Sequence, residues 1–421
     1  MVRDPHRAVS PDGTAGHAAS RRARGLTRTV IAWLATPLPP PPDQLRRGPW
    51  RDGAFTSDRR STALTARLGV LLGLAFAVCF ATGLLSHLIQ HPPGWFWWPS
   101  RPVRLYQVTQ GVHVATGLAC VPLLGAKLWS VYPRLFTWPP ARTPVHAAER
   151  ASIGILVAAA LFQLVSGVLN IALWYAPMPF IFTAGHYWVG WLAIGGLLIH
   201  VAVHLPVTRT ALLPQSAGTA VPARREVLTA VGAAAGLITL FTVGQTLRPL
   251  APLAVLTPRR PGTGPQGLPV NRTAADADVL DTARDPAYRL VVTGPNSTHH
   301  LSVADLAALT QHTVALPIAC VEGWSATAGW TGVRVSDLIA LTGADPRTSE
   351  VEVVSLEQHG AYRTSELTPP HTADPNTLLA LRLNGEILDP DHGYPVRLIA
   401  PNRPGVLQTK WVGSITVREL P

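Results

Sequence analysis

The stretch VALPIACVEGWS, residues 314–325, ends a β-rich run with a single cysteine, Cys320. Its short apolar run, closed by a turn signal, predicts a strand that delivers one thiol to a pocket. The other two cysteines, Cys79 and Cys120, lie in long apolar runs. A thiol that stands alone beyond those runs favours a metal ligand or a nucleophile over a disulfide framework.

The composition of the whole chain is that of a membrane protein. Of its 421 residues, 47% are hydrophobic and only 14% are charged. The formal net charge of +11 comes from arginines that lie near the N-terminus and in short loops beside apolar runs. Arginines in such places mark membrane topology, so we expect no nucleic-acid partner.

Five apolar runs are each long enough to cross a hydrocarbon core of about 30 Å as a helix that rises about 1.5 Å per residue. They predict an all-α bundle of five transmembrane helices in contact with membrane lipid: Leu64–Leu88, Tyr106–Val131, Ala151–Tyr175, His186–Pro206 and Val227–Leu247. Residues 1–60, rich in proline and arginine and without apolar periodicity, predict a disordered cytoplasmic tail.

Basic residues near the ends of the runs predict the orientation, because cytoplasmic loops carry the excess of lysine and arginine. They place the N-terminus in the cytoplasm and the chain after about Leu250 outside it, in a multi-pass protein of the cell membrane: Arg59, Arg60, Arg134, Arg142, Arg150, Arg209, Arg224 and Arg225. Arg224 and Arg225 also resemble a twin-arginine export signal, and an ordinary positive flank is the alternative.

Histidines within the runs are candidate haem ligands, because imidazole is costly in lipid and is the usual axial ligand of haem b. His113 and His186 both lie toward the outer face and predict one haem. His87 lies near the same face and could compete with His113 or contact a propionate. His200, 14 residues after His186 (200 − 186), would hold an inner haem. The alternative is buried histidines bonded to carbonyls.

Three blocks in this part, GVHVATG from Gly111, SGVL from Ser166 and HYWVGWL from His186, resemble the bacterial four-helix b-type cytochromes that exchange electrons with quinol. The resemblance covers about residues 61–206 and implies quinol or another electron carrier as a partner. In that family a histidine near the start of the first span completes the inner haem, whereas this chain has Arg67 there. Residues 207–250 add a loop and the fifth helix.

The last part of the chain, residues 251–421, begins with a Pro- and Gly-rich linker and continues with short β-rich runs. We predict an α+β domain, rich in strands, with helices at Val303–Leu309 and Val335–Leu341. The predicted strands are Tyr288–Thr293, Val314–Cys320, Val351–Leu356, Leu378–Leu383, Val396–Ala400 and Ser414–Val417.

The chemistry of Cys320 stays open on the residues alone. No second cysteine and no histidine at zinc spacing accompanies it, which argues against structural zinc. A soft or high-valent metal suits a single thiolate. A cysteine nucleophile with His359, His371 or His392 as its base is the alternative.

Six blocks in residues 265–421 resemble the sulfite-oxidase-type molybdopterin oxidoreductases in order and spacing. They are PVNRTAAD from Pro269, YRLVVTG from Tyr288, CVEGWS from Cys320, WTGVRVSDLI from Trp330, LNGEIL from Leu383, and HGYPVRLIAPNRPG from His392 with KWV from Lys410. The resemblance implies a molybdopterin-type molybdenum cofactor with Cys320 as the protein ligand and catalytic thiolate. It implies cofactor-binding roles for Asn271, Ala274, Ala275, Ser355, His392, Arg397, Gln408, Thr409 and Lys410.

Glu322 and Trp324 look more like the bacterial subgroup that includes the catalytic subunit of the periplasmic methionine sulfoxide reductase. That likeness implies oxygen-atom transfer on a small-molecule or protein S-oxide, with electrons exchanged with a membrane b-type haem. Two alternatives remain: a molybdenum enzyme with a haem-free membrane anchor, and a nonenzymatic cofactor-fold protein that binds a ligand or senses redox state.

Overall fold

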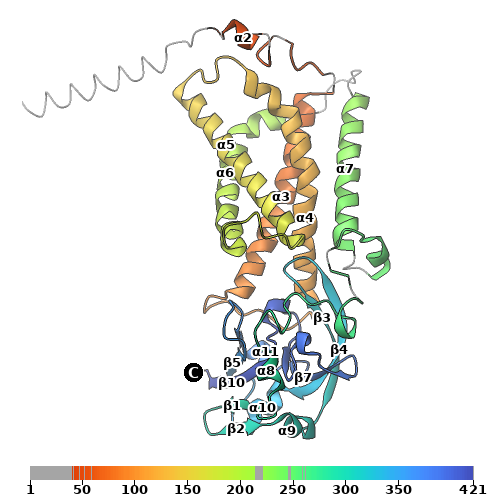
Figure 1. The fold of residues 1–421 in the computed structure, drawn as a ribbon. Helices are drawn as coiled ribbons and strands as arrows, with labels where there is room; N and C mark the ends of the chain where they lie inside the picture. The colour runs from red at the N-terminus through yellow and green to blue at the C-terminus, as the bar shows by residue number, and fades with distance from the viewer. Residues whose placement is uncertain are drawn as a thin grey trace, which may run out of the picture.

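The computed structural model describes residues 40–420 except positions 41, 47, 52, 58, 214–220, 245–247, 258 and 261. A bundle of long helices stands on one end of a β-rich domain (Figure 1). The long helices are α3 (Thr62–Gln90), α4 (Leu105–Val131), α5 (Pro144–Ile171), α6 (Phe182–Leu212) and α7 (Val221–Val243). All five are long and apolar enough to be candidate membrane spans.

The helix boundaries follow local signals more closely than the hydropathy does. Ser61 caps α3 through its side chain, and Thr143 caps α5 in the same way. Helix α5 ends at Ile171, before the predicted Tyr175, because Leu173 takes a left-handed conformation with φ 56°. The predicted fifth run ends at residues outside the described part of the chain, and α7 itself ends at Val243.

Part of the predicted tail contacts the bundle. Trp50 packs edge-on against Phe136, with ring centroids 5.5 Å apart, and Phe55 packs against Tyr132 at 4.9 Å. These partners belong to the 3₁₀ helix η1 (Tyr132–Phe136) that follows α4. Aromatic burial thus holds this part of the tail, whereas residues 1–39 lie outside the described residues.

The β-rich domain has two five-stranded sheets. The first has the order β2-β1-β10-β5-β6, and the second has the order β3-β4-β7-β8 with β9 also paired to β7. The strands are β1 (Leu290–Thr293), β2 (Thr298–Leu301), β3 (His312–Ala319), β4 (Ser325–Arg334), β5 (Ser349–Ser355), β6 (Thr364–Leu367), β7 (Leu378–Leu383), β8 (Glu386–Ile387), β9 (Arg397–Ile399) and β10 (Val412–Glu419).

Short helices complete the domain: α8 (Leu280–Arg284), α9 (Val303–Ala308), α10 (Val335–Leu341) and α11 (Pro369–Thr372). The predicted α+β domain is therefore present, with α10 at its predicted bounds. Strands β2, β4, β6 and β8 were not predicted from the sequence. Strand β4 joins two quoted blocks and pairs antiparallel with both β3 and β7, so it places Cys320 at the edge of a central hairpin.

Asn402 joins the two parts of the molecule. Its side-chain amide donates to the Pro99 carbonyl at 2.7 Å, and its Oδ1 accepts from the Tyr106 backbone N–H at 2.6 Å. Its carbonyl accepts from Trp98 Nε1 at 2.7 Å. Nearby, Arg101 pairs with the buried Asp374 at 3.2 Å. The loop between α3 and α4 is thus bonded to the domain at several points.

Candidate functional site

Cys320 lies directly after β3, in a tight turn that leads into β4. Its backbone N–H donates to the Trp324 carbonyl at 2.9 Å, and its carbonyl accepts from the Gly323 N–H at 3.1 Å. Gly323 adopts φ +91°, where a side chain would be strained. The turn fixes the cysteine backbone, and the thiol is buried.

A small polar cluster surrounds the thiol. Asn271 Nδ2 donates to Cys320 Sγ at 2.9 Å, while Asn271 Oδ1 accepts from Trp324 Nε1 at 3.2 Å. Trp324 Nε1 also lies 3.3 Å from Glu322 Oε2. Burial raises the pKa of both the Cys320 thiol and the Glu322 carboxyl. A bound cation is what such a buried thiol requires to become a thiolate.

Two residues that sequence reasoning missed border this cluster. Arg259 Nε donates to Asn271 Oδ1 at 3.3 Å. Tyr175, whose hydroxyl donates to Asn170 Oδ1 at 2.9 Å, comes from the loop between α5 and α6. Burial raises the pKa of Tyr175 to about 12, and the charge of Glu322 contributes to the rise. The only sequence signal for Arg259 was a basic pair in the linker.

The predicted cofactor-binding residues include a buried cationic group. Arg397 NH1 donates to the His392 carbonyl at 3.0 Å, and its guanidinium lies 5.2 Å from the ring centroid of Trp330. His392 Nε2 is 2.8 Å from the Pro265 carbonyl. Burial lowers the pKa of Arg397 to about 9. Arg397 Nε and Gln408 Oε1 are buried without a hydrogen-bond partner, so this region can accept a polar ligand.

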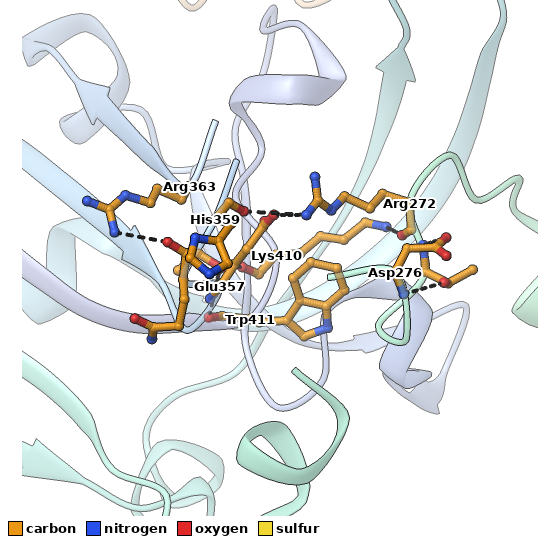
Figure 2. A network of polar contacts seen from close by, with 10 residues as sticks. Arg272, Asp276, Glu357, His359, Arg363, Lys410 and Trp411 are labelled. Atoms are coloured by element: carbon orange, nitrogen blue, oxygen red, sulfur yellow. Dashed lines mark hydrogen bonds and ion pairs between the residues drawn. The ribbon is translucent and has the colours of Figure 1, made fainter. Parts of the chain in front are cut away.

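Lys410 lies beside Arg272 and Glu357 (Figure 2). Its ammonium donates to the Asp391 carbonyl at 2.6 Å and the Arg272 carbonyl at 2.8 Å. The Arg272 guanidinium pairs in turn with Glu357. Burial, together with the charge of Arg397, lowers the pKa of Lys410 to about 7. An anion beside Lys410 would offset the cost of burying its ammonium charge, which fits a phosphate-bearing cofactor.

The remaining predicted residues lie around the same segments. Ser355 Oγ donates to the Lys410 carbonyl at 2.8 Å, and Thr409 Oγ1 is 2.7 Å from Ser365 Oγ. The Ala274 N–H donates to Asp391 Oδ1 at 2.8 Å. The Ala275 carbonyl accepts from the Asp278 N–H at 3.1 Å, and Ala275 is exposed. Ala275 is thus bonded within its own loop.

No histidine among the described residues hydrogen-bonds to Cys320. His371 is buried on α11, and His392 bonds to Pro265. His359 gives its carbonyl to Arg272 at 3.4 Å. The thiol instead interacts with the amide of Asn271, which cannot act as a base, and with Glu322, whose own pKa is raised by burial. The geometry therefore supports a metal ligand better than a histidine-activated nucleophile.

The bundle brings His113 and His186 together from α4 and α6. Their ring centroids are 6.3 Å apart with an angle of 77° between the planes. His113 Nδ1 lies 2.8 Å from the Cys79 carbonyl, and His186 Nδ1 lies 3.1 Å from Ser166 Oγ. Gly83 allows this placement, because a Cβ there would lie 2.7 Å from His113 Cε1.

These second partners orient each ring and leave its Nε2 as the candidate metal-binding atom. Two imidazole nitrogens on opposite sides of one iron lie about 4 Å apart, taking a metal–nitrogen distance of about 2 Å. The separation of the two ring centroids leaves room for such an arrangement. The donor set therefore fits a haem with two histidine ligands.

The other candidate haem ligands have different neighbours. The His87 ring stacks on Tyr187 with centroids 3.8 Å apart and lies 4.9 Å from His91. The His200 ring lies 4.5 Å from His204, on its own helix. His204 Nε2 in turn lies 3.4 Å from Glu149. Neither His87 nor His200 is paired with a histidine of another helix in the described part of the chain.

Comparison with known proteins gives a family match and several relatives of parts of this chain. Residues 277–421 match the family described as "Oxidoreductase molybdopterin binding domain". Rat mitochondrial sulfite oxidase is 29% identical over 161 residues, which are 32% of this chain and 30% of that protein. YedZ1 of Azospira oryzae, provisionally described as a protein-methionine-sulfoxide reductase subunit, is 32% identical over 181 residues, 42% of this chain and 63% of that protein.

A solved structure with some similarity is the sulfane dehydrogenase SoxCD of Paracoccus pantotrophus, at 21% identity over 37% of this chain and 43% of that chain. Its TM-score of 0.29 is too low to support a common overall fold. The matched stretch spans less than two thirds of each of these proteins. The family match and the relatives support an oxidoreductase enzyme with a molybdopterin-binding domain.

Proposed function

We propose that this protein is a membrane-bound molybdenum oxidoreductase that exchanges electrons with a b-type haem in its own helical bundle. The observation that carries the proposal is the setting of Cys320. It is a single buried thiol, bonded to Asn271, in the same domain as a buried cationic group with unpartnered polar atoms. This is the donor set that a molybdenum–pterin cofactor needs.

In this proposal Cys320 supplies the protein thiolate to molybdenum, and Asn271 positions its sulfur. His392, Arg397 and Lys410 bind the pterin and its phosphate, because charged and bidentate donors stabilise a buried anion. Ser355, Gln408 and Thr409 supply further polar contacts, as do the backbone groups near Ala274 and Ala275. Molybdenum bound in this way supplies oxygen-atom exchange with a small substrate.

The haem of this proposal is held by His113 and His186 near the outer end of the bundle. Their Nδ1 atoms already have partners, which leaves both Nε2 atoms for iron. Haem supplies one-electron transfer, and quinol in the lipid is the class of donor that suits an enzyme anchored there. His87 and His200 rank below this pair as ligands, because neither ring is paired with a histidine of another helix in the described part of the chain.

We propose an S-oxide, either free or on a protein, as the substrate. The description of the YedZ1 relative supports this class, and the sulfite oxidase relatives support sulfur chemistry in general. Reduction of an S-oxide to a thioether consumes two electrons and two protons and releases one water. The electrons would arrive from quinol, which becomes quinone and releases two protons.

We propose that the catalytic domain of this multi-pass protein lies outside the cytoplasm, as the arginine distribution predicts. Helix α3, which begins just after Arg60, starts at the end of the bundle opposite the β-rich domain (Figure 1). Helix α7, whose first turns carry Arg224 and Arg225, starts at that same far end (Figure 1). A positive flank at this end supports the proposed orientation.

One preparation tests the proposal. Intact protein from cells that make both cofactors is analysed for molybdenum, pterin and the reduced-minus-oxidised haem b spectrum, and is then assayed with quinol and methionine sulfoxide. We expect molybdenum, pterin and haem together, with turnover that requires Cys320 and His113. Molybdenum without a haem b band would instead support a haem-free anchor. Absence of both molybdenum and haem iron, together with no effect of Cys320→Ser on turnover, would support a nonenzymatic protein.

A further inference from the structure

Helix α4 contacts the turn that holds Cys320. Gln110 Nε2 donates to the Val321 carbonyl at 2.8 Å. One turn further along, Val114 packs on Gly323, where an added Cβ would lie 2.9 Å from a Val114 methyl. Gln110 and Val114 lie four residues apart and therefore share one face of the helix.

The same stretch of α4 carries His113. Two short connections thus join the proposed haem ligand to the proposed molybdenum ligand. One runs from His113 through its neighbour Val114 to Gly323, whose N–H donates to the Cys320 carbonyl at 3.1 Å. The other runs from Gln110 through its hydrogen bond to Val321, which is covalently bonded to Cys320.

The Gln110 contact is built rather than incidental. Gln110 is 5% exposed, in a helix whose outward positions are apolar. A buried amide in a membrane helix is costly unless it makes a hydrogen bond. Its bond is to a main-chain carbonyl, so it fixes the backbone of the turn rather than the position of one side chain. Because Gly323 has no side chain, the turn can lie close to Val114.

We infer that Gln110 is a positioning residue that sets the geometry between the two redox centres by clamping the Cys320 turn onto the helix that carries His113. The inference rests on the proposed function. In it α4 fixes the bond path between the centres, so the rate of electron exchange between them depends on Gln110. Substrate binding and the chemistry at molybdenum do not depend on it.

Gln110→Leu tests this, because leucine removes the amide at similar size and suits a membrane helix. The haem of intact protein is reduced, methionine sulfoxide is added, and haem reoxidation is followed by absorbance. We expect reoxidation to slow severalfold, because the turn that holds Cys320 loses its hydrogen bond to the helix that carries His113. Turnover driven by a dye that reduces the molybdenum domain directly, haem content and haem midpoint potential should stay at wild-type values.

Gln107→Leu is the matched control. Gln107 lies on the same helix, one turn earlier, and donates to Ser325 Oγ at 2.9 Å rather than to the backbone of the turn. We expect Gln107→Leu to leave haem reoxidation near the wild-type rate. Val114→Ala, which removes the methyls against Gly323, should slow reoxidation in the same direction as Gln110→Leu and serves if the latter fails to fold.

A second readout does not use the loaded enzyme. In protein purified without molybdenum cofactor, the backbone amides of residues 320–324 should exchange hydrogen faster in Gln110→Leu than in wild type or Gln107→Leu. Wild-type haem reoxidation in both Gln110→Leu and Val114→Ala would overturn the inference, as would an equal loss of dye-driven turnover. Absence of haem, or no effect of His113→Ala, would instead overturn the proposed function.

Discussion

The helical bundle and the β-rich domain differ most in the side chains that they expose. In the bundle the exposed positions are large and apolar, such as Leu198 at 64% exposure, whereas Gln110, Gln163 and Ser166 are buried. The domain buries a large apolar core, and strand β5 alternates buried with partly exposed residues. This difference is the one expected between a bundle that faces lipid and a domain that faces water, so the buried polar contacts of the bundle are its candidate functional contacts.

We expect the largest effect from Cys320→Ser, which tests the chemistry proposed for the β-rich domain. Serine replaces a soft thiolate with a hydroxyl that is a poor ligand for molybdenum. We expect turnover to fall to background while the haem b spectrum stays unchanged. Metal analysis, turnover and the haem spectrum measure this together. Full turnover in the serine variant would show that the domain does not use this thiol.

His113→Ala and His186→Ala test the bundle in the same way. Loss of either ligand should abolish the haem b spectrum and quinol-driven turnover, whereas dye-driven turnover of the domain continues. His87→Ala is the comparison variant, because the His87 ring stacks on Tyr187 and not on either histidine of the pair. Loss of the haem signal in His87→Ala, but not in His113→Ala, would contradict the proposed haem ligands.

Trp330→Ala and Leu198→Ala sharpen the contrast in packing. Trp330 is fully buried between strands and under Arg397, so we expect its loss to destabilise the domain by about 3–5 kcal/mol. Leu198 faces outward, and its loss should change membrane insertion by only a few tenths of a kcal/mol. Thermal unfolding in detergent, followed by near-ultraviolet circular dichroism, compares the two. Equal effects would contradict the outward assignment.

Lys410 predicts a dependence of stability on pH. Its pKa falls to about 7 in the folded protein from an ordinary value of 10.5. Between these values the unfolded chain binds more protons, so this lysine makes the free energy of unfolding rise as pH rises through that range. Thermal midpoints of cofactor-free Lys410→Met should lack this rise.

The control for that pH series is Arg418→Met, because Arg418 is 63% exposed and should keep the slope. Bound cofactor provides a second comparison. A phosphate beside Lys410 would hold the ammonium charged, so the slope should shrink in the loaded protein. A slope that is the same in wild type and Lys410→Met would show that another group produces it.

Local patterns predicted the elements with strong composition signals. The five long apolar runs correspond to α3 to α7, and the helix Val335–Leu341 has its predicted bounds as α10. The short or mixed strands β2, β6 and β8 were not predicted, because pairing with neighbouring strands stabilises them more than the propensities of their own residues do. Strand β4 was not predicted because its Ala-, Thr- and Gly-rich run has little apolar alternation.

The candidate sites divide in the same way. The sequence singled out Cys320 by its isolation, and His113 and His186 by their depth in the runs. It did not indicate Tyr175 or Arg259 beside the cysteine cluster, or Asn402 at the junction. Tyr175 and Asn402 interact with residues far away in the sequence, and no local pattern records such a contact.

By itself the sequence determined that the chain has a part with long apolar runs and a β-rich part, and it indicated which residues could bind metals. Hydropathy and residue chemistry are local properties, so they can be read without a fold. Only the tertiary structure decided that α4 carries His113 and also contacts the Cys320 turn through Gln110 and Val114. That placement depends on how the bundle packs against the β-rich domain. Such packing is decided by the shapes of the two surfaces, which residues close in sequence do not reveal.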